Sequence, residues 1–263
     1  MANDPGAALR ALHRPGDPFL LMNAWDVGSA RLMAALGAQA IGTTSAGFAF
    51  TLGLPDGARI TREQALEHAA DLAAATPLPV SADLENGYGS APEDAATAVS
   101  RAAEAGAVGG SIEDFHPEDG IYELGHARAR IAAAVEAAAG TGFEFTLTAR
   151  AENHIRGNPD LDDTIARLRA YEEAGADVLY APGLASPEQI RTVCEAVSKP
   201  VNVLALPNLS LEQVFAAGAQ RVSLGGSLAW VAVDGLVAAA TAIRDHGDLS
   251  SLAVSNETNR LLG

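Results

Sequence analysis

The sequence predicts one (β/α)8 barrel that occupies residues 1–263. Eight short apolar segments alternate with stretches of helical spacing, which is typical of a parallel sheet whose strands are joined by helices. The length of 263 residues suits a barrel of this kind. Four of the apolar segments follow the same helix–glycine–strand transition, as repeated βα units require.

The eight expected strands are apolar without clean alternation, as strands covered on both faces should be. They lie within residues 19–24, 38–44, 78–84, 107–114, 144–150, 177–182, 200–206 and 220–226. Among the helices between them, one carries an apolar stripe formed by Ile190, Val193, Cys194 and Val197, at helical spacing. Because Cys194 belongs to this stripe, we expect it to fill the core rather than to react.

The helix–glycine–strand transition repeats at residues 35–38, 104–107, 173–176 and 216–219. Each ends in Gly-Ala, and a glycine just past a helix end adopts the left-handed conformation at little cost. The alanine-rich run 131–140 is expected to be helix rather than linker. The apolar run 228–243 is longer than one barrel wall needs, which favours a homo-oligomer.

Composition argues against several classes of protein. The formal net charge is −16 and the 17 basic residues are scattered, so a nucleic-acid partner is not expected. No run of about 18 apolar residues is free of charge, and the first ten residues lack a signal pattern, so no membrane span or leader is expected. A single cysteine permits no internal disulfide, and the expected location is the cytoplasm.

Barrels of this type carry their chemistry at the carboxyl ends of the strands, and four acids gather there in the sequence. They are Asp56, Asp83, Glu85 and Glu113. Carboxylates so close must hold protons or share a cation, and an oxygen-only set suits Mg²⁺ or Mn²⁺. Asp83 and Glu85 point the same way if the strand continues through both. The alternative is that individual acids cap helices or pair with arginine.

One cation, Arg150, also lies at a strand end. It could stabilise a developing oxyanion, or it could form a buried salt bridge with Glu113 or Glu152, and the two roles are compatible. The hydroxyl- and glycine-containing turn 43–47 could hold a carboxylate, and the turn 223–227 could hold a phosphate. Trp25 and Asn202, at or near the ends of their strands, are further candidates for substrate binding.

These residues together give the chain a resemblance to the isocitrate lyase/phosphoenolpyruvate mutase superfamily over almost its whole length. The segments that carry it are TTSAGFAFTLGLPDG from Thr43, SADLENGYG from Ser81, GGSIED from Gly109, LTARAEN from Leu147 and KPVNVLA from Lys199. The resemblance implies a barrel that binds Mg²⁺ and a 2-oxo acid or its enolate. It also implies that the last helix is exchanged between subunits of a homodimer or, more often, a homotetramer.

The resemblance assigns roles residue by residue. The superfamily's metal-site acids match Asp56, Asp83, Glu85 and Glu113, its carboxylate-binding turn matches Thr44, Ser45 and Ala46, and its oxyanion-stabilising arginine and strand-7 asparagine match Arg150 and Asn202. Many members have aspartate in place of Glu85. The extra methylene can be absorbed if contact with the metal runs through water.

The chain departs from the superfamily in the loop after the fourth strand. The lyases carry a cysteine there that handles a proton, whereas residues 115–126 contain neither cysteine nor lysine. Tyr122, His116 and His126 remain as possible proton donors, although each also suits an ordinary loop. Tyr180 stands where many lyases have a glutamate.

Taken together, the sequence predicts a Mg²⁺-dependent lyase that acts on a small 2-oxo mono- or dicarboxylate. Decarboxylation or aldol-type cleavage would proceed through an enolate. Phosphonopyruvate or phosphoenolpyruvate P–C chemistry is an alternative, disfavoured by an acidic loop that would repel a phosphonate. A non-catalytic binder of 2-oxo acids is another.

Overall fold

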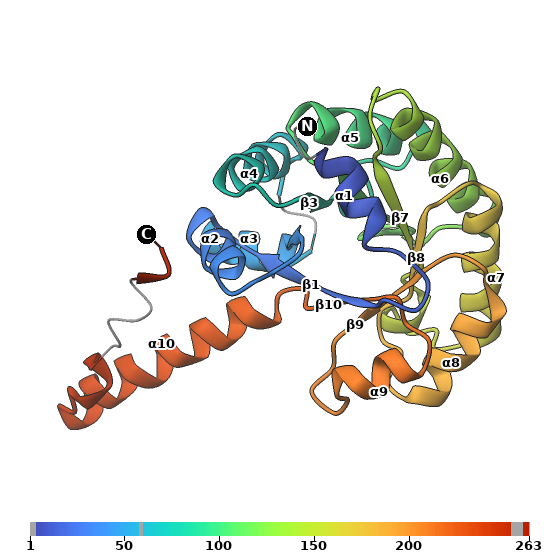
Figure 1. The fold of residues 1–263 in the computed structure, drawn as a ribbon. Helices are drawn as coiled ribbons and strands as arrows, with labels where there is room; N and C mark the ends of the chain where they lie inside the picture. Colours follow the sequence, from blue (N-terminus) through green and yellow to red (C-terminus); the bar gives the residue numbers. More distant parts are fainter. Residues whose placement is uncertain (1–3, 58–59, 254–259, 263) are drawn as a thin grey trace.

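Eight parallel strands close into a barrel in the computed structural model, which describes residues 4–57, 60–253 and 260–262 (Figure 1). The barrel strands are β1 (Phe19–Ala24), β2 (Ile41–Thr43), β3 (Val80–Asp83), β4 (Gly109–Glu113), β7 (Thr146–Arg150), β8 (Val178–Tyr180), β9 (Val201–Leu204) and β10 (Arg221–Ser223). Each pairs with the next one along the chain, and β10 closes the ring on β1. The predicted (β/α)8 fold is confirmed, and all eight strands lie within the predicted segments.

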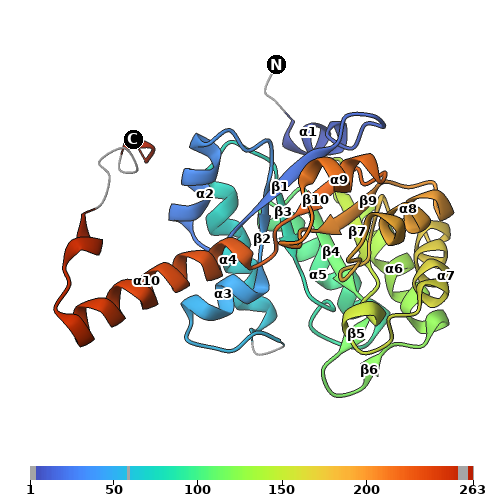
Figure 2. The same cartoon turned by 90° about the horizontal axis from the view of Figure 1, so that it is seen from below.

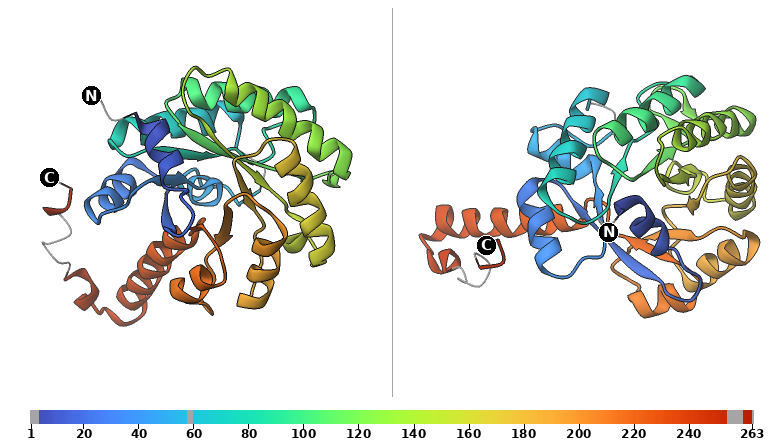
Figure 3. Two further views of the ribbon diagram at one scale, coloured as in Figure 1. Left: turned by 45° about the vertical axis from the view of Figure 1, so that its right-hand side comes forward. Right: turned by 45° about the horizontal axis from the view of Figure 1, so that its top comes forward.

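Helices cover the outside of the barrel (Figures 1 and 3). The described residues form the helices α1 (Pro5–Ala11), α2 (Val27–Ala35), α3 (Ser45–Thr51), α4 (Arg62–Ala75), α5 (Pro92–Glu104), α6 (Leu124–Ala139), α7 (Leu161–Glu173), α8 (Pro187–Ala196), α9 (Leu211–Ala216) and α10 (Ser227–His246), with short 3-10 turns η1 (Asn153–Ile155) and η2 (Ser250–Leu252). The alanine-rich run is therefore helical, in α6. Of these helices, α1 covers one end of the barrel and α10 extends away from it.

The predicted helix–glycine–strand transitions are confirmed by the backbone. Gly37, Gly106, Gly175 and Gly218 have φ of 90°, 95°, 102° and 108°. Only glycine adopts such angles without strain, so these positions end their helices and turn the chain into the next strand.

The core lies between the strands and the helices. On α8, Ile190 and Val193 are fully buried, and the half-buried Cys194 packs at the edge of the same cluster. Burial raises the pKa of the Cys194 thiol to about 11, so at neutral pH the group is protonated and weakly nucleophilic. This agrees with the filling role expected from its stripe.

The amino end of the barrel is covered by α1. Its Leu9 is fully buried and packs with Phe19 and Val108, which lie at the starts of their strands. Arg10 reaches across to donate to the Phe145 carbonyl, at 3.3 Å. A substrate therefore has to reach the barrel from the opposite, carboxyl end.

A two-stranded hairpin, absent from the predicted elements, follows β4. Its strands β5 (Phe115–His116) and β6 (Gly120–Ile121) pair antiparallel and project beyond the barrel (Figure 2). The hairpin lies within residues 115–126, which contain neither cysteine nor lysine.

The helix α10 leaves the barrel and extends away from it (Figures 1 and 2). Only its first turn is anchored, where Ala229 is buried and Trp230 meets the Phe50 ring edge-on at 5.6 Å. In length and composition α10 could cross a bilayer, and 6 % of its apolar window is buried. Asp234 interrupts the apolar run, however, and such a helix is also typical of a surface that packs against protein.

Candidate active site

A pocket of about 270 Å³ opens at the carboxyl ends of β2, β3, β4 and β7. It is lined by Ser45, Asp56, Gly57, Glu85, Asn86, Glu113, Phe115, Pro117, Arg150 and Arg156. The barrel thus brings three of the four predicted acids together with the predicted arginine, although they come from separate parts of the chain. The strand register explains part of this, because Glu113 and Arg150 are direct partners between β4 and β7.

Arg150 lies between two carboxylates at the pocket wall. Its Nη1 is 3.4 Å from Glu113 Oε2, and its Nε donates to Glu152 Oε1. Its guanidinium carbon also lies 5.2 Å from the centre of the Tyr180 ring. Burial alone lowers the pKa of Arg150, but Glu113 and Glu152 raise it well above the ordinary value. The guanidinium is a permanent cation held in one orientation, so the salt-bridge interpretation is correct and leaves the oxyanion role open.

Glu113 is largely withdrawn from solvent, with 11% of its side chain exposed. Burial raises its pKa well above the usual range, Arg150 opposes the shift, and Glu152, Asp83 and Glu85 add to it. The neighbouring Asp114 points the other way, as alternation along a strand requires, and forms a 3.0 Å ion pair with Arg167. Of the two adjacent acids, Glu113 alone therefore faces the pocket.

Asp83 ties the turn after β2 to the end of β3. Its Oδ2 accepts from the amide and the hydroxyl of Ser45, at 3.1 and 2.8 Å. Thr44 caps α3 by accepting from the Gly47 amide at 3.3 Å, and Ala46 lies in the first turn of that helix. The predicted carboxylate-binding turn is thus placed beside the metal-site candidate Asp83.

Glu85 reaches the pocket by a route different from the predicted one. The strand β3 ends at Asp83, so Glu85 is not its strand neighbour on the same face. Glu85 and Tyr88 are instead the two non-glycine residues with positive φ among those described, at 47° and 63°. This loop conformation is costly, and such strain is commonly found at functional sites. The strained loop turns Glu85 toward the pocket.

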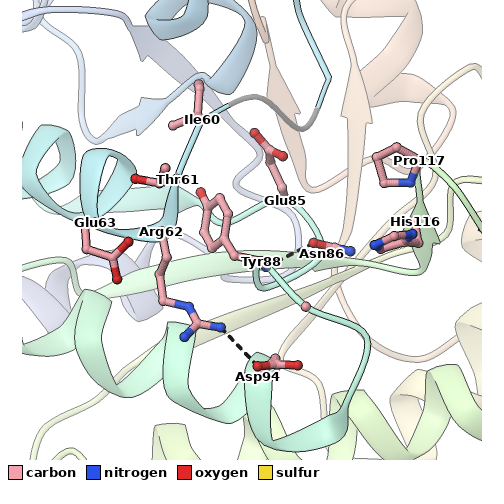
Figure 4. Close-up of a pocket in the computed structure, with 11 residues that line it drawn as sticks. Ile60, Thr61, Arg62, Glu63, Glu85, Asn86, Tyr88, Asp94, His116 and Pro117 are labelled. Atoms are coloured by element: carbon pink, nitrogen blue, oxygen red, sulfur yellow. Dashed lines mark hydrogen bonds and ion pairs between the residues drawn. The ribbon is translucent and has the colours of Figure 1, made fainter.

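A larger neighbouring pocket of about 530 Å³ shares Glu85 and Asn86 with the first (Figure 4). Tyr88 lines it, and its hydroxyl is buried with no hydrogen-bond partner in the described part of the chain. Burial raises the pKa of Tyr88 well above its usual value, and Glu85 raises it further. The phenol is therefore neutral and stays a potential donor. His116 of the hairpin lines this pocket together with Asn86 (Figure 4).

Two of the three candidate proton donors serve the structure. The Tyr122 hydroxyl is a partner of Asn86 Nδ2 at 3.1 Å and of Ser90 Oγ at 3.4 Å. His126 Nε2 lies 2.8 Å from the Ser90 carbonyl. Only His116 lines either pocket, so it is the candidate that the geometry leaves in place.

The other two predicted binding residues lie outside the two pockets described above, although Asn202 lines a smaller cavity of about 60 Å³ together with Asp83 and Arg150. Asn202 is buried in the barrel, where its Nδ2 donates to Ser223 at 2.9 Å and its Oδ1 accepts from Arg221 at 2.9 Å. Trp25 packs against the buried cluster that includes Ala30 and Met33, outside the residues that line these pockets. Binding of substrate by either residue stays a prediction.

The turn after β10, considered for phosphate, is already engaged. The amides of Leu224 and Gly225 donate to Asn23 Oδ1 at 2.8 and 3.0 Å. These two donors are therefore not free to hold a phosphate.

The donor chemistry of the pocket fits Mg²⁺, although the ligands are not arranged as a closed set. Among residues 4–57, 60–253 and 260–262, no three His, Cys, Asp or Glu side chains are grouped to hold a metal ion. Two of the candidate acids have other partners, since Glu113 is paired with Arg150 and Asp83 with Ser45. Oxygen donors that only partly surround an ion suit Mg²⁺, which keeps several of its waters.

Sequence reasoning missed Arg156, which lines the same pocket as Arg150. It also named Glu152 only as a possible salt-bridge partner, whereas this residue is completely buried and binds both arginines. Both residues could have been found from their position in the sequence, since they follow shortly after the end of a predicted strand.

Fold and pocket together define a class: a (β/α)8-barrel enzyme with an acidic, arginine-containing site at the carboxyl ends of its strands. The chain belongs to the phosphoenolpyruvate phosphomutase family, whose model matches residues 9–244. Its relatives place it in the isocitrate lyase/phosphoenolpyruvate mutase superfamily of lyases and mutases, as the motifs indicated.

Among curated relatives, an uncharacterised protein of Mycobacterium tuberculosis is 38% identical over 240 residues, 90% of this chain and 88% of the relative. The 2-methylisocitrate lyase of Escherichia coli K12 is 31% identical over 76% of this chain and 69% of its own. The oxaloacetate decarboxylase of Pseudomonas entomophila is 28% identical, with 86% and 79% covered.

Among solved structures, a protein of Burkholderia cenocepacia J2315, provisionally assigned as a lyase or mutase, is 51% identical with a TM-score of 0.93. The match covers 97% of this chain and 94% of that one. A phosphonopyruvate hydrolase solved with oxalate and Mg²⁺ is 25% identical with a TM-score of 0.85, covering 98% and 94%.

Proposed function

We propose that this enzyme is a Mg²⁺-dependent lyase that breaks a bond next to the carbonyl of a small 2-oxo carboxylic acid. The observation that carries the proposal is that Asp56, Glu85 and Glu113 line one pocket with Arg150. Support also comes from relatives, which include an oxaloacetate decarboxylase and a phosphonopyruvate hydrolase with bound Mg²⁺.

In this proposal, Asp83, Glu85, Glu113 and Asp56 would hold the metal, directly or through water. When bound, Mg²⁺ would polarise the keto and carboxylate oxygens of the substrate as a Lewis acid. The turn of Thr44, Ser45 and Ala46 would hold the substrate's first carboxylate beside Asp83.

For a 2-oxo acid with a carboxylate on carbon 3, the bond to that carboxylate breaks and CO₂ leaves. The electron pair remains as an enolate, whose oxygen Arg150 would stabilise, and a proton from water then restores the 2-oxo acid. Because Glu113 and Glu152 already fix Arg150, it needs no reorganisation when the charge develops.

A turnover screen tests the proposal. The protein is assayed with Mg²⁺ against oxaloacetate, phosphonopyruvate and 2-methylisocitrate, before and after EDTA treatment. We expect turnover of the 2-oxo diacid that EDTA abolishes and Mg²⁺ restores. Turnover of phosphonopyruvate alone would assign P–C chemistry instead, and metal-dependent binding without turnover would identify a non-catalytic binder.

We also propose that the protein is a homodimer or homotetramer in which α10 packs on a second copy. Val231, Leu236 and Val237 on this helix are 66%, 65% and 56% exposed. Leaving several large apolar side chains in water on one projecting helix is unfavourable, and burying them against a second copy would remove the cost.

A further inference from the structure

A second arginine lines the proposed active-site pocket, and the reaction outlined above gives it no part. Arg156 follows the 3-10 turn η1, six residues after Arg150. Its side chain is 35% exposed, so it is held by the protein yet open to the pocket.

Two contacts fix the direction of this guanidinium. Its Nε donates to Glu152 Oε2 at 2.9 Å, and its guanidinium carbon lies 3.9 Å from the centre of the Phe115 ring. In the part of the chain that the structure describes, no hydrogen bond or ion pair engages the terminal Nη atoms. These nitrogens are a fork of donors of the kind that binds a carboxylate in a bidentate manner.

Glu152 fixes the positions of the two arginine side chains relative to each other. Its two oxygens each accept from one Nε, that of Arg150 and that of Arg156, and the carboxylate is completely buried. Its own backbone amide donates to Asp114 Oδ1 at 2.8 Å. The two guanidinium groups are therefore held side by side on one rigid support, as two separate cations in a single pocket.

The pocket extends along the barrel mouth, with Ser45 and Arg156 on different sides of it. Ser45, beside Asp83, follows β2, whereas Arg156 follows β7, and β3 and β4 lie between these two strands. A substrate whose first carboxylate lies at the Ser45 turn would extend past Glu85 and Glu113 toward Arg156. A negative group at its far end would meet the free donors.

We propose that Arg156 binds the distal carboxylate of a 2-oxo dicarboxylic acid and so selects diacids over 2-oxo monocarboxylates. This inference rests on the proposed function and narrows its substrate class. Arg156 is then a specificity-determining residue, and Glu152 and Phe115 are positioning residues that act through it.

Calorimetric binding with Mg²⁺-loaded protein tests the subsite without requiring turnover. The probes are two matched pairs, 3,3-difluorooxaloacetate with 2-oxobutyrate and 2-oxoglutarate with 2-oxovalerate, so that chain length is sampled. Oxalate, too short to reach Arg156, reports on the metal end alone. The variants are Arg156→Gln, which keeps a donor for Glu152, and Arg101→Gln, a change in an exposed pair with Glu104.

We expect wild-type protein to prefer at least one diacid over its matched monoacid. Arg156→Gln should weaken that diacid roughly 10- to 100-fold, the loss expected for a charge-assisted hydrogen bond. The affinity of Arg156→Gln for oxalate and for the monoacids should change by less than about threefold. Arg101→Gln should bind every probe with wild-type affinity.

The failures are distinguishable. Equal affinity of wild-type protein for diacids and monoacids, with oxalate bound, would overturn the subsite and leave the proposed function standing. Equal weakening of oxalate and diacid by Arg156→Gln would show that Arg156 only supports the loop, which also overturns it. No Mg²⁺-dependent binding of any probe to wild-type protein would overturn the proposed function itself.

Discussion

At the residue scale, the site depends on ion pairs that share partners. Glu152 serves two arginines, and Arg150 serves two glutamates. Buried ion pairs add little net stability because desolvation offsets the attraction, but they fix geometry closely. The charged side chains of this pocket are thus held in place by one another, without a bound ligand.

Replacing Arg150 tests its proposed role toward the enolate. Arg150→Ala should lower kcat for the 2-oxo acid by roughly 10²–10³-fold, the usual loss for a removed oxyanion donor. Steady-state kinetics at saturating Mg²⁺ measure this, with the exposed Arg101→Ala as the matched control. A kcat within threefold of wild type would contradict the assignment.

Replacing Asp83 tests the metal site. Asp83→Ala removes a carboxylate beside the Ser45 turn and should abolish or strongly weaken Mn²⁺ binding, measured by electron paramagnetic resonance titration. Asp71→Ala, on the exposed face of α4, is the control and should bind as wild type does. Undiminished affinity in Asp83→Ala would place the ion elsewhere.

At the element scale, we expect the hairpin β5–β6 to influence which reactions the pocket supports, because its His116 lines the larger pocket. The hairpin lies in the loop where the resemblance to the lyases leads us to expect a proton-handling cysteine, whereas residues 115–126 contain none and the one cysteine of this chain lies on α8. In the larger pocket, His116 Nδ1 lies 3.2 Å from the Glu118 amide nitrogen and 3.3 Å from Asp119 Oδ2.

We therefore expect poor cleavage of 2-methylisocitrate. Acid–base assistance is typically worth about 10²–10⁴-fold, so kcat/KM for this substrate should fall at least about 10²-fold below that for the preferred 2-oxo acid. Coupled detection of the 2-oxo acid product measures both. Cleavage at about 10 s⁻¹, an ordinary enzymatic rate, would refute the loop argument. His116→Asn would then be the first variant to make.

The other element with a distinct role is α10, which the barrel leaves exposed. Sedimentation at micromolar concentration should give a species larger than the 26.9 kDa monomer. Val231→Asp with Leu236→Asp, which places two charges on the exposed face, should shift it to the monomer. Leu36→Asp, at an exposed leucine after α2, is the control. A wild-type monomer, or a double variant that stays associated, would exclude this interface.

At the scale of the whole molecule, the two ends of the barrel are specialised. The carboxyl end holds the pocket, while α1 covers the amino end, where Arg221 is buried and, among the described residues, has no carboxylate as a hydrogen-bond partner. Arg221 donates to His13 Nε2 at 3.3 Å, so His13 must carry its proton on Nδ1, which donates to the Leu9 carbonyl at 3.0 Å. Burial, followed by Arg221, lowers the pKa of His13 to about 3.

This arrangement makes stability sensitive to acid. The unfolded chain takes up a proton at His13 near pH 6.5, whereas the folded protein does not until about pH 3, so stability is lost as pH falls through this window. The slope from this group is at most about 1.4 kcal/mol per pH unit. Urea unfolding between pH 7.5 and 5 should show that His13→Gln loses less stability than wild type. Equal losses would rule His13 out.

The sequence predicted the barrel because its strands and helices follow local rules. Apolar runs, helical stripes and glycines with positive φ each act over a few residues, and Gly106 or Gly175 can be recognised from neighbours alone. The acids after the strands could be found in the same way, since the carboxyl ends of parallel strands share one edge. The grouping of Asp56, Glu85 and Glu113 with Arg150 follows from that rule.

Only the tertiary structure decided which side chains of the site pair with one another. Nothing local indicates that Glu152 binds both Arg150 and Arg156, or that Asn202 is engaged by Arg221. The strained loop that turns Glu85 into the pocket was likewise beyond the sequence patterns. Secondary structure is set by periodicity over short stretches. A side chain's partner depends on how distant strands close the ring, and that closure is a property of the whole chain.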